Sequence, residues 1–279
     1  MGSHSLALIV LGALCAAALL AAIAWGIRRR RRIKRIHEPF PDHWRKLLHR
    51  SLPLYRRMPA ELRLRLEPRV REFLLDVDFI GCQGLLVTDE MRLVIATQAC
   101  LLIAGRPAAR YRSLYGILIY PDEFVVEESD EDEAGVITEG TRVLSGQTFE
   151  TSRIVLSWRD VQESGTGDEA YNVVLHEFAH HLDHSVGGSL TSSSSRQRAQ
   201  ESWHAVLNRE YEGLCDAVDA GEPTLIDPYG AEHLEEFFAV ATETFFERPR
   251  ELQRRHAHLY AELQGFYRLD PVSWPAPVD

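Results

Sequence analysis

The sequence predicts an α+β domain that follows a single N-terminal transmembrane helix. Two patterns in the 279 residues support this fold class. Segments with helical apolar periodicity lie on both sides of a few short runs of β-branched and aromatic residues, so helices, strands and further helices succeed one another. One uncharged stretch near the N-terminus is long enough to cross a bilayer. We therefore expect an anchor with a basic stop-transfer segment (1–35) and a globular domain (36–279).

The composition is that of a globular protein with an acidic body. Hydrophobic residues make up 45% of the chain and charged residues 26%, which excludes collagen-like, coiled-coil and wholly disordered classes. From residue 36 onward, 41 acidic side chains outnumber 24 basic ones, so direct nucleic-acid binding is not expected. The four cysteines show no paired spacing, which favours a reducing compartment.

The uncharged stretch runs from Leu6 to Ile27. As a helix it would span about 33 Å, enough for the bilayer core. Seven basic residues follow within Arg28–Arg35, whereas a cleaved signal peptide carries its positive charge before the apolar run. This charge bias predicts a single-pass protein of the inner, cytoplasmic membrane whose C-terminal domain faces the cytoplasm. The alternatives are a buried helix of a soluble core and, for the arginines, an arm that binds nucleic acid.

The first half of the domain is expected to mix helices with short strands. Helical periodicity is found in three segments: the approach to Arg50, Pro59–Asp76 with an interruption near Pro68, and Met91–Ala104. Apolar runs typical of buried strands are Tyr115–Tyr120, Phe124–Val126 and Arg153–Trp158. Phe79–Gly84 is predicted as a loop or short strand, and the acidic run Glu127–Glu133 as a solvated loop.

The second half is expected to be helical. The predicted helices are Tyr171–Val186, Arg198–Tyr211, Glu232–Glu247 and Arg250–Tyr267. Gly221–Gly230 contains two prolines and is predicted as a loop. Within the third of these helices, a stripe of apolar residues is expected to be buried: Phe237, Phe238, Ala241 and Phe245.

One of these helices carries a pattern that indicates metal chemistry. Residues 176–180 read His-Glu-x-x-His, and residues four apart lie on one face of a helix. His176 and His180 are therefore expected to bind one metal ion, and zinc suits imidazole ligands. Glu177 could then act as general base on a water that the zinc activates for attack on a carbonyl. The alternative is a polar face with coincidental histidines, against which the apolar run Val173–Leu175 argues.

A catalytic zinc site needs a third protein ligand. Downstream, Glu232, Glu236 and Glu243 share one face at helical spacing. Glu236 stands beside two phenylalanines, where burial would be costly unless the carboxylate met a cation. Asp227 is an alternative third ligand, which would make the chain a metal-using hydrolase of another kind. His233 is a further candidate, whereas His181 is expected to be solvated.

These segments resemble the Mlc titration factor A family of bacterial zinc metallopeptidases and, more distantly, the catalytic domain of anthrax lethal factor. The resemblance covers residues 40 to 255. Three motifs carry it: Leu175–Asp183 (LHEFAHHLD), Asp227–Gly230 (DPYG), and Glu235–Glu247 (EEFFAVATETFFE) followed by Arg248-Pro249. Together they are far more specific than His-Glu-x-x-His alone.

The resemblance implies that residues 36–279 form a zincin-like metallopeptidase domain. It implies roles for six residues: zinc ligands His176, His180 and Glu236, general base Glu177, oxyanion donor Tyr229, and Asp183 as a residue that orients an imidazole. It also implies peptide substrates and a sugar-responsive repressor as partner. The anchor is a departure, because the family members that the chain resembles are soluble.

Three functions compete at this point. The first is a membrane-anchored zinc peptidase that cleaves peptides on the cytoplasmic side. The second is a membrane-tethered binding protein on a peptidase fold, which sequesters a transcriptional regulator. The third is the hydrolase that Asp227 would complete. We favour the first, because a pure binding protein has no need of the base Glu177.

Overall fold

The computed structural model has the predicted α+β class: helices dominate, and a small, mainly parallel sheet accompanies them. It describes residues 19–27, 29–106, 111, 113–122, 124–131, 137–144, 146–149, 152–166, 170–186 and 194–275. Within 124–149 and 183–201 the description covers the backbone alone. The chain divides into two compact units, residues 1–40 and 41–279.

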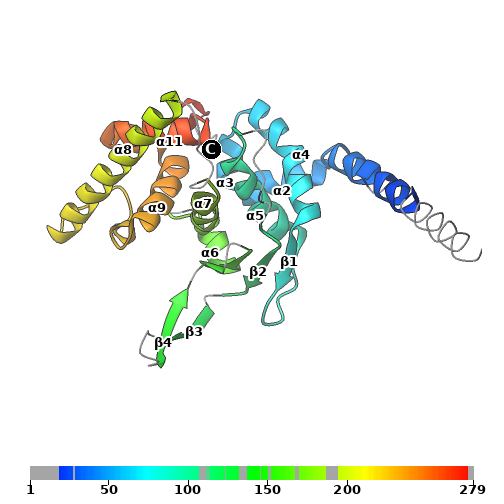
Figure 1. Cartoon of the computed structure of the whole chain (residues 1–279), viewed down its shortest axis with the longest axis horizontal. Coiled ribbons are helices and arrows are strands. Elements are labelled where there is room, and N and C mark those ends of the chain that lie inside the picture. The colour runs from blue at the N-terminus through cyan, green and yellow to red at the C-terminus, as the bar shows by residue number, and fades with distance from the viewer. Residues whose placement is uncertain are drawn as a thin grey trace, which may run out of the picture. The chain divides into compact units, whose positions relative to one another are not determined.

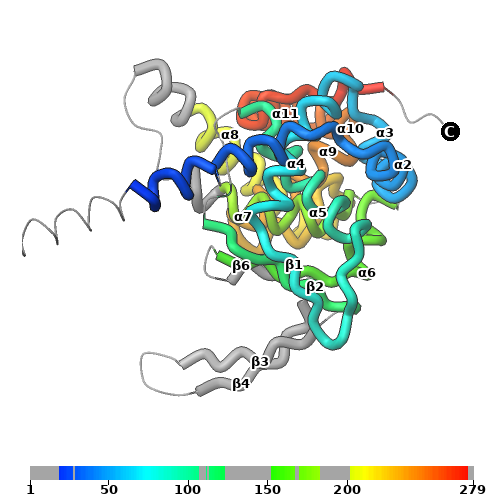
Figure 2. The backbone as a smooth tube through the Cα atoms, turned by 90° about the vertical axis from the view of Figure 1, so that its right-hand side faces the viewer, coloured from blue at the N-terminus to red at the C-terminus, as the bar shows by residue number. Residues whose placement is uncertain are grey.

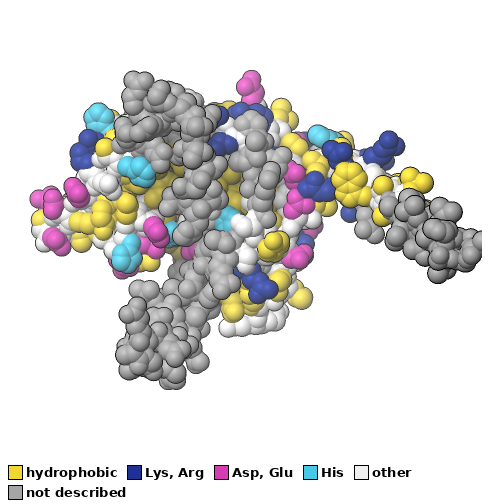
Figure 3. Space-filling model, in the orientation of Figure 1, with side chains coloured by type: hydrophobic (Ala, Val, Ile, Leu, Met, Phe, Trp, Pro, Cys, Tyr) yellow, Lys and Arg dark blue, Asp and Glu magenta, His cyan; other side chains and the backbone are white. Residues whose placement is uncertain are grey.

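In the first unit, residues 19–27 and 29–36 are helical. Apolar and basic side chains stand beside one another on this segment (Figure 3), and the Arg29 guanidinium lies 5.6 Å from the centre of the Trp25 ring. The expected transmembrane stretch Leu6–Ile27 falls largely outside the described residues. Among the residues that are described, no helix has both the length and the apolar character needed to cross a membrane.

The second unit opens with three helices: α2 (Asp42–Ser51), α3 (Pro53–Arg57) and α4 (Ala60–Asp76). The predicted interruption of α4 is wrong, because the helix runs through Pro68. Proline removes the N–H that would bond the carbonyl of Leu64. Leu64 is exposed, so water can replace that donor.

A four-stranded sheet in the order β1-β2-β6-β5 lies beside these helices. Three of its strands are parallel: β1 (Asp78–Gly81), β2 (Gly116–Tyr120) and β6 (Arg153–Ser157). The edge strand β5 (Gly146–Phe149) is antiparallel to β6. Ile117, Ile119, Ile154 and Leu156 are fully buried, which explains why the predicted strands are almost continuously apolar.

β3 (Phe124–Glu131) and β4 (Ile137–Leu144) form a separate two-stranded antiparallel sheet. The prediction of a loop over the acidic run is therefore wrong for residues 127–131, which are paired with β4. The ladder is made of backbone hydrogen bonds, whose formation does not require an apolar side chain.

Three helices occupy the middle of the unit: α5 (Asp89–Leu102), α6 (Trp158–Glu163) and α7 (Val173–Val186). Figure 2 shows α4, α5 and α7 on one side of the sheet strands. α7 presents four fully buried side chains to this packing, namely Val174, Leu175, Phe178 and Ala179. The Phe178 ring lies 5.1 Å from that of Tyr111 and 5.9 Å from that of Phe73, so the motif helix is anchored by aromatic contacts.

The C-terminal part is helical, as expected: α8 (Ser194–Asp219), the 3₁₀ turn η1 (Pro228–Ala231), α9 (Leu234–Glu247), α10 (Pro249–Arg255), α11 (Ala257–Tyr267) and the 3₁₀ turn η2 (Pro271–Ser273). The buried stripe predicted for α9 is confirmed, and α7 and α9 lie side by side (Figure 1). The single helix predicted over Arg250–Tyr267 is wrong. His256 leaves the helical region (φ −131°, ψ 55°) and places its Nδ1 2.8 Å from Glu210 Oε2 of α8.

Gly230 lets η1 approach α9 closely, and we expect Gly230→Ala to destabilise the fold. A Cβ at this position would lie 2.6 Å from Val240 Cγ2 and 3.2 Å from the Phe237 Cα, so a stiff side chain or the backbone would have to move. The expected loss is about 1–3 kcal/mol of unfolding free energy, measured by urea denaturation. Gly213→Ala in α8 is the matched control, because a Cβ at this position meets open space. This substitution should stabilise the helix slightly. Equal stability of the two variants would contradict the packing argument.

Candidate metal centre

The N-terminus of α7 fixes the position of the motif. Asn172 precedes the helix, and its Oδ1 accepts a hydrogen bond of 3.1 Å from the Leu175 backbone N–H, as an N-cap does. The His176 N–H bonds to the Asn172 carbonyl at 3.0 Å. With one helix face buried, His176 and His180 fall on another face, where their side chains remain 15% and 14% exposed.

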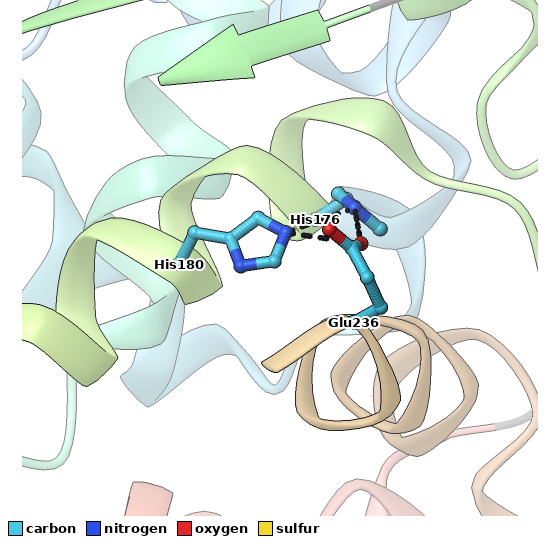
Figure 4. A group of neighbouring side chains, drawn as sticks. All are labelled: His176, His180 and Glu236. Carbon is cyan, nitrogen blue, oxygen red and sulfur yellow. Dashed lines mark hydrogen bonds and ion pairs between the residues drawn. The ribbon is translucent and has the colours of Figure 1, made fainter. Parts of the chain in front are cut away.

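Glu236 comes to these histidines from the first turn of α9 (Figure 4). The His176 and His180 Nε2 atoms are 3.1 Å apart, and Glu236 Oε2 lies 3.1 Å from the first and 3.3 Å from the second. Both imidazoles and the carboxylate thus point at one another. Among the described residues this is the cluster of three side chains suited to hold a metal ion.

The spacing of the three atoms fits a metal ion. Around a tetrahedral zinc with bonds of about 2.0–2.1 Å, ligand atoms stand about 3.4 Å apart. The observed separations of 3.1–3.3 Å are close to this value. Two histidines and a glutamate are also a donor set of catalytic zinc sites, in which a fourth position stays open for water or substrate.

The charges around His176 favour a cation at the same point. Burial disfavours a charged imidazole, but hydrogen bonds with Glu236 and Glu243 outweigh it and raise the pKa of His176 to about 10. Burial also acts on Glu236, yet its bonds to His176 and His180 hold its pKa well below the usual range. The helix N-terminus of α9 favours the ionised Glu236 as well. The site is therefore built to surround positive charge.

Glu243 is a part of the site whose role the sequence did not reveal. Its Oε1 lies 2.8 Å from His176 Nδ1, on the side of the ring away from Glu236. When Nδ1–H donates to this carboxylate, the Nε2 lone pair is left for a metal ion, and the ring orientation is fixed. The signal was its helical spacing: Glu243 follows Glu236 by seven residues and shares its face.

The other predicted residues lie around this cluster. Glu177 is 5% exposed and sits on α7 next to the first histidine, and the Tyr229 ring centre lies 6.1 Å from that of His176. Tyr229 is 45% exposed, so its hydroxyl-bearing ring borders solvent next to the cluster. Asp227 instead caps η1, because its Oδ1 accepts from the Tyr229 N–H at 2.8 Å. The catalytic roles of Glu177 and Tyr229 stay predictions.

Three further expectations have different outcomes. His233 is the N-cap residue of α9 and is not part of the cluster. His181 is not solvated but 2% exposed, because it packs against Tyr111 with ring centres 5.5 Å apart. The side chain of Asp183 lies outside the described residues.

The similarity of this chain to known proteins extends well beyond the motif. The family model described as "Glucose-regulated metallo-peptidase M90" matches residues 25–268. The chain is 37% identical to "Uncharacterized protein slr2042" of Synechocystis over 84% of this chain and 86% of that protein. It is 33% identical to "Mlc titration factor A" of Pectobacterium atrosepticum, over 83% and 88%, and 32% identical to its namesake in Serratia proteamaculans, over 85% and 92%.

Replacing Glu243 tests how far the site depends on it. A carboxamide offers one acceptor where Glu243 meets two donors, so Glu243→Gln should weaken metal binding about 10- to 100-fold. Competition of the purified protein with a fluorescent chelator measures this. Glu235→Gln changes an exposed neighbour on the same helix and should leave the affinity unchanged. Equal affinities in the two variants would refute the orienting role.

Proposed function

Because this chain belongs to the glucose-regulated metallo-peptidase M90 family, we propose that it is a zinc-dependent peptidase with Glu177 as general base. The relatives also bear out the resemblance to the Mlc titration factor A family. The observation that carries the proposal is the convergence of His176, His180 and Glu236 at zinc-ligand spacing.

In this proposal the chain divides the chemistry among a few side chains. His176, His180 and Glu236 hold the zinc, which when bound would polarise the scissile carbonyl and favour an attacking hydroxide. Glu177 takes the proton of the attacking water and passes it to the leaving amine. Because the Glu177 side chain is buried, water screens its carboxylate only weakly, and its electrostatic interaction with the reacting groups is stronger. Tyr229, at the exposed side of the cluster, donates a hydrogen bond to the developing oxyanion.

The metal assignment predicts close to one zinc per chain in the purified protein. His176→Ala should remove the metal, because it deletes one ligand and leaves Glu243 Oε1 without the imidazole that it bonds. His204→Ala is a matched control, since His204 is an exposed histidine of α8. Metal content measured by atomic absorption decides the point: full zinc retention in His176→Ala would overturn the ligand set.

The role of the base predicts a different phenotype. Glu177→Gln should retain zinc and lose turnover of a peptide library about 10²-fold or more, since a general base contributes at least that factor. Tyr229→Phe should retain both zinc and stability while slowing turnover, because one oxyanion donor is lost. Wild-type turnover by Glu177→Gln would exclude the mechanism.

A second candidate function is capture of a transcriptional regulator. The name that the relatives bear, Mlc titration factor A, supports it. A binding protein would keep its partner when the base is lost, so Glu177→Gln separates the two functions. If Glu177→Gln still binds a regulator, and cells that carry this variant behave like the wild type, capture would be favoured over cleavage.

We also propose that the protein is held in the cytoplasmic membrane with the peptidase domain on the cytoplasmic side. The support is the uncharged run Leu6–Ile27 and the seven basic residues within Arg28–Arg35. A reporter that is active in the cytoplasm should work when fused after Asp279, whereas one that matures outside should stay inactive. Neutral residues in place of Arg28–Arg32 should scramble this orientation. The reverse reporter pattern would place the enzyme outside the cytoplasm.

A further inference from the structure

Two carboxylates are buried behind the metal centre. Glu243 and Glu247 stand one turn apart on the same face of α9, and their side chains are 6% and 7% exposed. Like charges at this spacing repel, and burial raises the pKa of both groups. Such a pair is tolerated only where hydrogen-bond donors and positive charge compensate it.

Arg57 supplies positive charge and hydrogen bonds to Glu247. Its guanidinium reaches from α3 to Glu247 Oε2 at 2.6 Å and also donates to the Phe246 and Glu247 carbonyls at 3.0 Å each. These two carbonyls lie in the last turn of α9, where helical N–H partners are missing. Arg57 therefore caps the helix and fixes the carboxylate at once.

Asn172 supplies hydrogen-bond donors to both carboxylates. Its backbone N–H donates to Glu243 Oε2, and its Nδ2 donates to Glu247 Oε1 at 2.8 Å. The second Nδ2 proton goes to Gln98 Oε1 of α5 at 2.7 Å, while Oδ1 caps α7. Asn172 is 1% exposed, and all its polar groups are used.

We propose that Asn172 is the positioning residue of the metal centre: it locks the start of α7 to Glu243 and Glu247 of α9 and so holds His176 in the orientation that binds metal. The connection runs from Arg57 through Glu247 and Asn172 to Glu243, and from Glu243 Oε1 to His176 Nδ1. Two ligands of the site stand on α7 and the third on α9, so this lock controls the distance between them. The inference rests on the proposed metal site.

The competing explanation is that Asn172 merely caps α7. The two explanations differ in which atoms matter. Capping needs only an acceptor oxygen, which serine supplies about as well as asparagine. The lock also needs the two amide protons, which serine lacks.

The test compares zinc affinities of the full-length purified protein by chelator competition. Asn172→Ser should keep the helix content of the wild type and raise the dissociation constant for zinc at least fivefold. Thr88→Ala removes the N-cap of α5 instead and should lower the midpoint of unfolding while zinc affinity stays within twofold. A change of less than fivefold in Asn172→Ser would overturn the lock and leave capping as the explanation.

A second variant covers the case in which Asn172→Ser does not fold. Glu247→Gln is isosteric, but Asn172 and Arg57 bond to different oxygens of Glu247, and the variant has an NH₂ group in place of one of them. It should raise the zinc dissociation constant at least threefold, and a smaller change would overturn the lock. A wild-type chain that binds no zinc would instead overturn the proposed function itself, so the two failures are distinguishable.

Discussion

The metal centre depends on the close packing of α7 against α9. Neither helix forms the site alone, because two candidate ligands, His176 and His180, come from α7 and the third, Glu236, comes from α9. Each helix buries an almost continuous apolar face, which leaves it one arrangement relative to its neighbour. Gly230 brings the turn that carries Tyr229 against α9 and α8. The ligand geometry is thus a product of core packing, with the charged groups placed where that packing leaves them.

α9 combines a row of acidic side chains with buried aromatic side chains. Its acids Glu236, Glu243 and Glu247 recur at intervals of seven and four residues and form one row along the helix. The same helix carries buried aromatic side chains, of which Phe245 and Phe246 contact the rings of Tyr260 and Tyr267 of α11. A row of carboxylates that are largely shielded from water is costly unless each one meets a donor or a cation. The histidines of α7, the asparagine that caps α7 and an arginine of α3 meet that need.

The sequence predicted the parts of the site that follow from local spacing. His176 and His180 are four residues apart, and helical periodicity alone puts them on one face. The buried stripe of α9 and the helices of the C-terminal half could likewise be predicted from local spacing. Glu236 could be singled out by its phenylalanine neighbours, but its choice over Asp227 needed the family resemblance and the folded geometry.

What the sequence could not predict depends on tertiary contacts. The role of Glu243 requires knowing which side of the His176 ring faces α9, and the burial of His181 requires knowing that Tyr111 lies beside it. Pro68 did not end α4, because the carbonyl it deprives faces outward. His256 broke the last helix, where it bonds to a glutamate some 46 positions earlier. In each case the folded surroundings of the residue decided the outcome, which local preference alone does not reveal.

The reach of Arg57 into the end of α9 changes how the boundaries of this protein should be drawn. α3 is a helix of five residues, and by sequence it would pass for a spacer ahead of the motif-bearing half. Yet its last residue neutralises a carboxylate that would otherwise be stranded in the interior. A fragment cut to begin at α5 would keep His176, His180 and Glu236 and still carry a buried charge without its arginine, three hydrogen bonds away from His176. Gene dissection, domain grafting and circular permutation of this fold should therefore treat α3 as inseparable from the half that carries the candidate metal centre.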